Sequence, residues 1–206
     1  MSDILKWVRE QSKTQHANNS KWWYDLVTGD RLDRNRGELL ALVHSEISEA
    51  WQGLYHFDDK LPEQNGALTE IADALIRVFD MLGGFGICFP DSQVFPELVI
   101  SEEGCGVAYA INECHSSVTN LLEVYRKHSD DNDKLVKGYA NLIGTLFSTY
   151  SLILDLIDDE VVVEFNTLQP FATTDLVDLL NMKAEYNKNR ADHKVENRIA
   201  DGGKKF

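Results

Sequence analysis

The sequence has few cysteines and prolines, and acidic residues outnumber basic ones. The three cysteines have no Cys-x-x-Cys spacing, so we expect reduced thiols rather than a disulfide framework. With 20 lysines and arginines against 34 aspartates and glutamates, the net charge of −14 argues against non-specific binding to nucleic acid polymers or anionic membranes. A small phosphorylated ligand remains compatible with this charge, because divalent metal ions offset local repulsion.

Long apolar runs are also missing from the sequence. No run is long enough to suggest a membrane span, and no hydrophobic segment follows Met1. Together with the sparse cysteines, this predicts a cytoplasmic protein that has no membrane partner.

The most prominent pattern in the sequence is helical periodicity of the apolar residues. The 206 residues are 43% apolar and include only four prolines, which predicts an all-α fold with a sizeable core. We treat residues 1–206 as a single domain. Helices are predicted over residues 3–15, 35–57, 106–128, 132–157 and 173–190. A further helix, which follows 35–57, is predicted to end near residue 82, before two glycines. Irregular connections are predicted over residues 84–104 and 158–172, with a short extended piece at 161–163.

Two of these helices each carry a pair of acids three residues apart. Glu46 and Glu49 lie on one helix, and Glu70 and Asp73 lie on the next. Positions i and i+3 are about 60° apart around a helix, so both members of a pair face the same way. Glu46 and Glu49 fall on the apolar side of their helix, where an unpaired carboxylate is unfavourable.

Antiparallel packing of the two helices would make these four carboxylates converge. Such a cluster needs cations to stay ionised, and hard oxygen ligands suit Mg²⁺ or Mn²⁺. The alternative is that the acids are solvated and pair within their own helices, for example Asp73 with Arg77. Two acid pairs on neighbouring amphipathic helices favour the metal interpretation.

This Glu-x-x-Glu and Glu-x-x-Asp pattern resembles the signature of the all-α nucleoside triphosphate pyrophosphohydrolases, the MazG and dimeric dUTPase-like superfamily. In that family the four acids hold Mg²⁺ against a triphosphate. The resemblance extends to a Lys-x-x-x-Asn-x-x-Arg element, here Lys183, Asn187 and Arg190, which is followed by a basic, glycine-rich tail. It implies that Lys183 and Arg190 stabilise phosphate charge and that Asn187 orients the ligand. Without the resemblance, these residues would be an ordinary basic helix end.

Three further residues are candidates for substrate binding. Lys60 lies in the connection between the acidic helices, where the resemblance implies an approach to the phosphates. The adjacent Trp22 and Trp23 allow two interpretations, as anchors of the core or as a stacking surface for a nucleobase. The residues alone leave both interpretations open.

Residues 106–157 resemble a degenerate repeat of the acidic helix pair. They lie in a segment, 88–172, that we interpret as an insertion relative to a compact phage and bacterial branch of the family. In the alignment His44 matches His115 and Phe79 matches Phe147. The four acids are replaced, in order, by Ser117, Asn120, Gly138 and Asn141. Chance alignment of two amphipathic helices is the alternative. Our hypothesis is that this copy packs against the acidic pair as an internal pseudo-subunit.

The resemblance implies a Mg²⁺-dependent enzyme, with Mn²⁺ as a substitute, that cleaves a (deoxy)nucleoside triphosphate to the monophosphate and pyrophosphate. Glu49 and Glu46 would be catalytic: activated water attacks the α-phosphorus and Glu49 takes its proton. The alternatives are a dUTPase-like enzyme that also accepts dUDP, a dGTP-preferring phage enzyme of a modified-nucleotide pathway, and a non-catalytic nucleotide-binding helical module. The intact acids argue against the last. We also expect a homodimer, because many family members complete their bundle with a second subunit.

Overall fold

The computed structural model describes residues 3–97, 106–158, 175–194 and 197–198. Within these residues the chain forms six α-helices and no β-strand, which confirms the predicted all-α class. The elements are α1 (Asp3–Asn19), η1 (Ser20–Trp22), α2 (Arg36–Gln52), α3 (Gly66–Phe85), α4 (Gly106–His128), α5 (Asn132–Asp158), α6 (Leu176–Asn189) and η2 (Ala191–His193), where η marks a 3₁₀ helix. The predicted extended piece at 161–163 lies outside the described residues.

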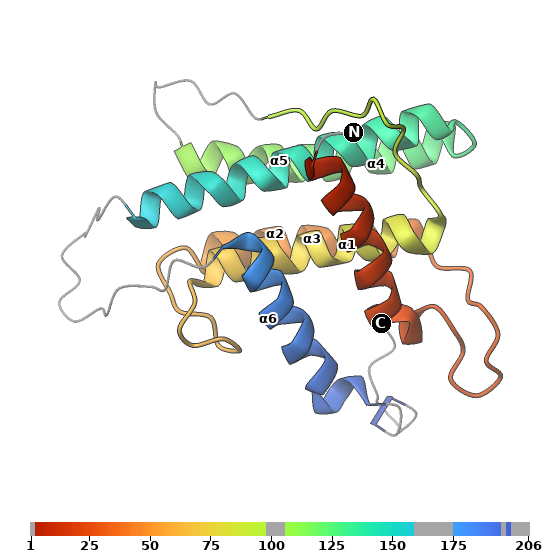
Figure 1. The fold of residues 1–206 in the computed structure, drawn as a ribbon, viewed down its shortest axis with the longest axis horizontal. Coiled ribbons are helices and arrows are strands. Elements are labelled where there is room, and N and C mark those ends of the chain that lie inside the picture. Colours follow the sequence, from red (N-terminus) through yellow and green to blue (C-terminus); the bar gives the residue numbers. More distant parts are fainter. Residues whose placement is uncertain (1–2, 98–105, 159–174, 195–196, 199–206) are drawn as a thin grey trace.

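The central element is α3, which packs against α1, α2, α5 and α6. Sixteen of its twenty residues are buried, so α3 is the core helix of the bundle. In Figure 1, α2 and α3 form one layer, α4 and α5 form a second layer, and α1 and α6 run steeply across α3. Because α3 is surrounded, its polar side chains are also drawn into the interior and must find partners there.

The acidic helix α2 begins as predicted but ends earlier. Oδ1 of Asn35 accepts hydrogen bonds from the backbone N–H groups of Gly37 and Glu38, at 2.8 and 3.2 Å, and so caps the helix. The predicted end near residue 57 is wrong, because the helix stops at Gln52 and the chain turns at Gly53. A Cβ at Gly53 would lie 2.7 Å from the backbone carbon of Gly66, so this turn depends on close contact between two glycines.

The predicted stop of α3 at two glycines is also wrong. The helix continues through Gly83 and Gly84 and ends at Gly86, whose φ of 68° is left-handed. Inside the helix the two glycines permit close packing instead. A Cβ at Gly83 would lie 2.4 Å from the Cβ of His16, and one at Gly84 would lie 2.1 Å from the ring of Trp23.

By length and composition, residues 132–157 of α5 would suit a membrane span. In this fold α5 packs against α4 and α3, and Tyr139, Leu142 and Leu146 are fully buried. Bundle packing therefore accounts for the apolar side of this helix.

The second helix pair packs on the first and does not form a separate lobe. Both α2–α4 and α3–α5 are in contact, and one pair of aligned residues, His44 and His115, meets directly. The rings of His44 and His115 stack with their centroids 5.0 Å apart. Trp7, on α1, contacts Phe79 and Phe147, each at 5.7 Å between ring centroids. The two helix pairs are thus joined directly at one set of aligned positions and through Trp7 at another.

The positions that replace the acids have different surroundings. Oγ of Ser117 lies 3.1 Å from Oγ1 of Thr145, and Asn141 is exposed. A Cβ at Gly138 would lie 2.9 Å from Cδ1 of Leu121, so a side chain at the position aligned with Glu70 would displace the end of this leucine. The second pair thus keeps the packing of the first without its acidic site.

Candidate functional site

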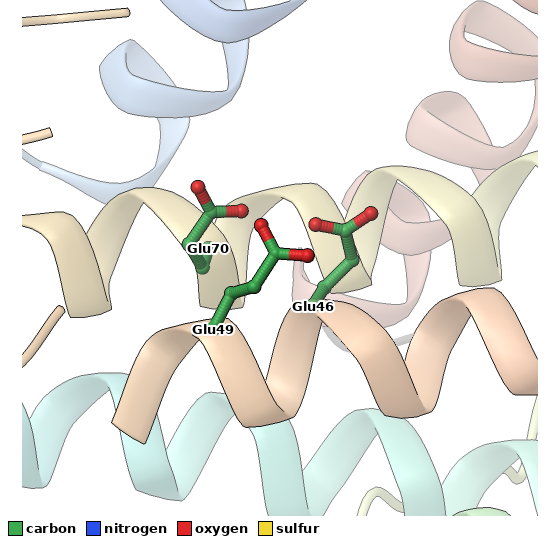
Figure 2. Close-up of side chains that lie close together, drawn as sticks. All are labelled: Glu46, Glu49 and Glu70. Carbon is green, nitrogen blue, oxygen red and sulfur yellow. The ribbon is translucent and has the colours of Figure 1, made fainter. Parts of the chain in front are cut away.

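Three of the four predicted acids converge where α2 packs on α3. Glu46 and Glu49 lie one turn apart on α2, and Glu70 lies on α3. Each can place one carboxylate oxygen within 4.8 Å of the others. Figure 2 shows the three carboxylates pointing to the same side of the helix pair. Three oxygens at this spacing suit a hard divalent cation.

The two glutamates of α2 have different surroundings. Glu46 is buried, and its Oε1 accepts a hydrogen bond of 2.6 Å from Nε of Arg77. Arg77 therefore reaches across to α2, whereas the solvated alternative paired it with Asp73 on its own helix. Glu49 is exposed and accepts a hydrogen bond of 3.2 Å from Oγ of Ser45. Glu46 is thus held in place, while Glu49 is accessible from solvent.

Glu70 is the most strongly perturbed acid of the cluster. It is 6% exposed, and within the described part of the chain its Oε2 atom has no hydrogen-bond partner. Its other oxygen lies 3.4 Å from Nζ of Lys60. Burial raises the pKa of the Glu70 carboxyl to about 8, although the positive charge of Lys183 opposes this shift. A buried acceptor without a hydrogen-bond partner, beside two more carboxylates, is chemically suited to a cation.

Asp73 lies beside this convergence and is engaged by α6. Nζ of Lys183 lies 3.1 Å from Oδ2 of Asp73, and Nδ2 of Asn187 donates a 3.4 Å hydrogen bond to Oδ1. Burial raises the pKa of Asp73, and the charge of Lys183 opposes this rise. The structure therefore places Lys183 and Asn187 against an acid that was predicted to bind metal.

A cavity of about 290 Å³ opens next to the cluster, a size near the lower end for small-molecule pockets. Residues from α2, α3, α6 and the loops around them line it. The predicted residues in its wall are Trp22, Glu46, Glu49, Lys60, Asp73, Asn187 and Arg190. Polar or charged wall residues that the sequence did not single out are Asn19, Arg34, Ser45, Arg77, Asp80 and His193. The cavity thus combines carboxylates with cations and one aromatic ring.

The two tryptophans differ in their positions. Trp22 lines the cavity, and the guanidinium of Arg198 lies over its ring, 3.6 Å from the centroid. Trp23 is 2% exposed and packs in the core, where its Nε1 donates a 2.9 Å hydrogen bond to Oδ1 of Asp80. Trp22 is also buried, at 8% exposed, but of the two it is the one that borders the cavity.

Asp80 connects the cavity to α1 and was missed from the sequence. Its Oδ1 lies 2.8 Å from Nδ1 of His16, as well as accepting the bond from Trp23. Burial raises the pKa of Asp80, against the effect of these two partners. The available signal was its spacing, because Asp80 follows Asp73 by seven residues and so shares a face of α3.

Comparison with known proteins adds no relative. No family model, no curated protein and no solved structure matches this chain. The chemical argument therefore rests on the arrangement of the side chains. The glutamate cluster offers oxygen ligands suited to a divalent cation, and Lys60 and Arg190 bring positive charge to the wall of the neighbouring cavity.

Proposed function

We propose that this protein is a Mg²⁺-dependent nucleoside triphosphate pyrophosphohydrolase, a proposal that joins the resemblance stated above to the geometry of the site. The observation that carries it is the convergence of Glu46, Glu49 and Glu70 beside a cavity that also has cationic walls. Acids alone would repel a triphosphate. Acids that can hold a cation, next to the positive charges of Lys60 and Arg190, suit a triphosphate.

In this proposal some residues hold the metal ion and others take part in the reaction. Mg²⁺ or Mn²⁺ at the three glutamates would neutralise phosphate charge and activate water. Arg77 fixes the orientation of Glu46, so this carboxylate is suited to a constant ligand position. Glu49 is solvent-accessible and accepts a hydrogen bond from the Ser45 hydroxyl, so it is suited to accept a proton.

The reaction consumes one water for each triphosphate. The water oxygen forms a bond to the α-phosphorus, the bond between that phosphorus and the bridging oxygen to the β-phosphorus breaks, and pyrophosphate leaves. The proton released by water goes to Glu49. Arg190 and Lys60, both in the cavity wall, stabilise the phosphate charge, and Trp22 is placed to contact the base.

Pyrophosphate release from a panel of ribo- and deoxynucleoside triphosphates, with and without Mg²⁺, tests this function. We expect release only with the metal. Reaction in ¹⁸O-labelled water should place the label in the monophosphate, because attack is at the α-phosphorus. Including dUTP with dUDP, and dGTP, separates the dUTPase-like and dGTP-preferring alternatives from a broader activity. No release from any triphosphate at saturating Mg²⁺ or Mn²⁺ would contradict the proposal.

A further inference from the structure

Lys183 occupies an unusual position for a lysine. Its side chain is fully buried, and Nζ lies 3.1 Å from Oδ2 of Asp73, 3.8 Å from Oδ2 of Asp58 and 3.9 Å from Oε1 of Glu70. Within the described chain none of these contacts is an aligned hydrogen bond, so charge holds the ammonium in place. A buried lysine is unfavourable unless carboxylates surround it. Here the surrounding acids come from the α2–α3 loop and from α3.

The acids consequently form two adjoining groups with Glu70 in common. On one side, Glu46, Glu49 and Glu70 converge, with Arg77 paired to Glu46 and Lys60 lying 3.4 Å from Oε1 of Glu70. The other oxygen of Glu70, Oε2, has no hydrogen-bond partner in the described chain. On the other side, Asp58, Asp73 and Glu70 face Lys183. The first group keeps one buried carboxylate oxygen available to a divalent cation, whereas the Lys183 ammonium fills the space between the acids of the second group.

The charges agree with this division. Within the described residues, five carboxylates gather here, Glu46, Glu49, Asp58, Glu70 and Asp73, and Lys60, Arg77 and Lys183 each form an ion pair with at least one of them. With all five acids ionised, the group has two negative charges in excess. One divalent cation balances that excess, and a second would leave an equal positive excess in a largely buried site.

We infer that Lys183 is a built-in cation beside Asp73, so that the nucleotide-free protein binds a single divalent cation, at Glu46, Glu49 and Glu70. This inference rests on the metal site of the proposed function, but not on its substrate. It makes Lys183 a positioning residue, which holds Asp73 and Asp58 while docking α6 onto α3. Any further metal ion must then arrive with the polyphosphate that supplies its ligands.

The inference is tested by titrating the metal-free protein with Mn²⁺ alone. Electron paramagnetic resonance measures the concentration of free Mn²⁺ at each step. We expect one Mn²⁺ per wild-type chain and two per chain in Lys183→Met, because the substitution frees the position beside Asp73. Lys183→Arg should keep a stoichiometry of one, since it preserves the charge. Lys188→Met is the matched control, because Lys188 is exposed on the same helix and should also leave one site. Circular dichroism with Mn²⁺ present checks that each variant is folded.

A second variant covers the case in which Lys183→Met does not fold. Asp73→Asn should change the affinity for the single Mn²⁺ by less than about threefold, because Asp73 contacts Lys183 and not that ion. A loss of more than about tenfold would make Asp73 a ligand and overturn the inference. Two Mn²⁺ per wild-type chain, or one in a folded Lys183→Met chain, would also overturn it.

The titration also separates this inference from the proposed function. One Mn²⁺ per chain together with no pyrophosphate release would contradict the function alone. Pyrophosphate release together with two Mn²⁺ per nucleotide-free chain would contradict the inference alone.

Discussion

At the scale of single residues, the acids of the site differ in their surroundings more than in their residue type. Glu46 has a fixed arginine partner, Glu70 is buried with one oxygen unsatisfied in the described chain, and Glu49 faces solvent. Equal carboxylates therefore suit different tasks, because burial and neighbouring charges decide which of them holds a proton or a cation.

The first prediction at this scale concerns Glu49. Glu49→Gln should lower kcat by about 10²–10⁴-fold, because the amide cannot accept the proton of water. Circular dichroism should be unchanged, since Glu49 is exposed. Glu38→Gln is the matched control, because Glu38 is an exposed glutamate on the same helix and does not line the cavity. Activity of Glu49→Gln close to wild type at saturating Mg²⁺ would remove this residue from the catalytic group.

The second prediction concerns the thiol of Cys114. Burial raises its pKa to about 12, and Sγ lies 3.2 Å from Oγ1 of Thr149. A Cys88→Ser, Cys105→Ser variant leaves this thiol alone. We expect it to react with Ellman's reagent at least about 100-fold more slowly than free cysteine, because the thiolate is the reactive form. Urea should restore full reactivity, and rapid reaction of the folded protein would show that Cys114 is not enclosed.

At the scale of helices, the α2–α4 contact contains two stacked histidines. Their Nδ1 atoms lie 2.7 Å apart, so at least one ring must be neutral for one nitrogen to accept a hydrogen bond. Burial lowers the pKa of both His44 and His115, and for His44 the charge of its neighbour adds to the effect. The contact is therefore sensitive to acid.

The sign of the pH dependence follows from these lowered pKa values. Below the ordinary value of about 6.5, the unfolded chain binds more protons than the folded one. The stability from this pair is thus fully present above about pH 6.5 and is lost as the pH falls through the lowered pKa values. Urea unfolding from about pH 7.5 to about pH 5 should show this loss, and His115→Gln should make it smaller. His128→Gln, an exposed site on α4, should leave it unchanged.

A further prediction for an element concerns the end of α6, where Arg190 lines the cavity. Arg190→Ala should raise KM for the triphosphate about 10- to 100-fold, because a charge-assisted phosphate contact contributes about 1.5–3 kcal/mol. Lys188→Ala is the control, since Lys188 is 72% exposed on the same helix. Thermal unfolding should be similar for both variants. An unchanged KM for Arg190→Ala would make this helix end a structural feature only.

At the scale of the whole molecule, α1 connects the two helix pairs through Trp7. Its ring contacts Phe79 of α3 and Phe147 of α5, so Trp7→Ala should lower the free energy of unfolding by about 3 kcal/mol. Trp51→Ala is the control, because Trp51 is 50% exposed. Urea unfolding followed by circular dichroism should give one transition in both variants. Two separate transitions in wild type would show that the pairs fold independently.

The sequence by itself determined where most helices lie and which acids share one face of a helix. The predicted helix 106–128 coincides with α4 (Gly106–His128), and Asn35 caps α2 at the predicted start of that helix. Periodicity and capping involve residues within a few positions of each other, so they can be recognised without knowledge of the fold. The convergence of Glu46, Glu49 and Glu70 was predicted from their i, i+3 spacing on the condition that the two successive helices pack antiparallel.

Only the tertiary structure decided which partners these residues have. It paired Arg77 with Glu46 on another helix and placed Lys183 against Asp73. It also put Trp22 in the cavity wall and Trp23 in the core, although the two are adjacent in sequence. The physical reason is that charge pairing and burial depend on distances between side chains far apart along the chain. Local periodicity places a side chain on a face of its helix, but it does not specify what packs against that face.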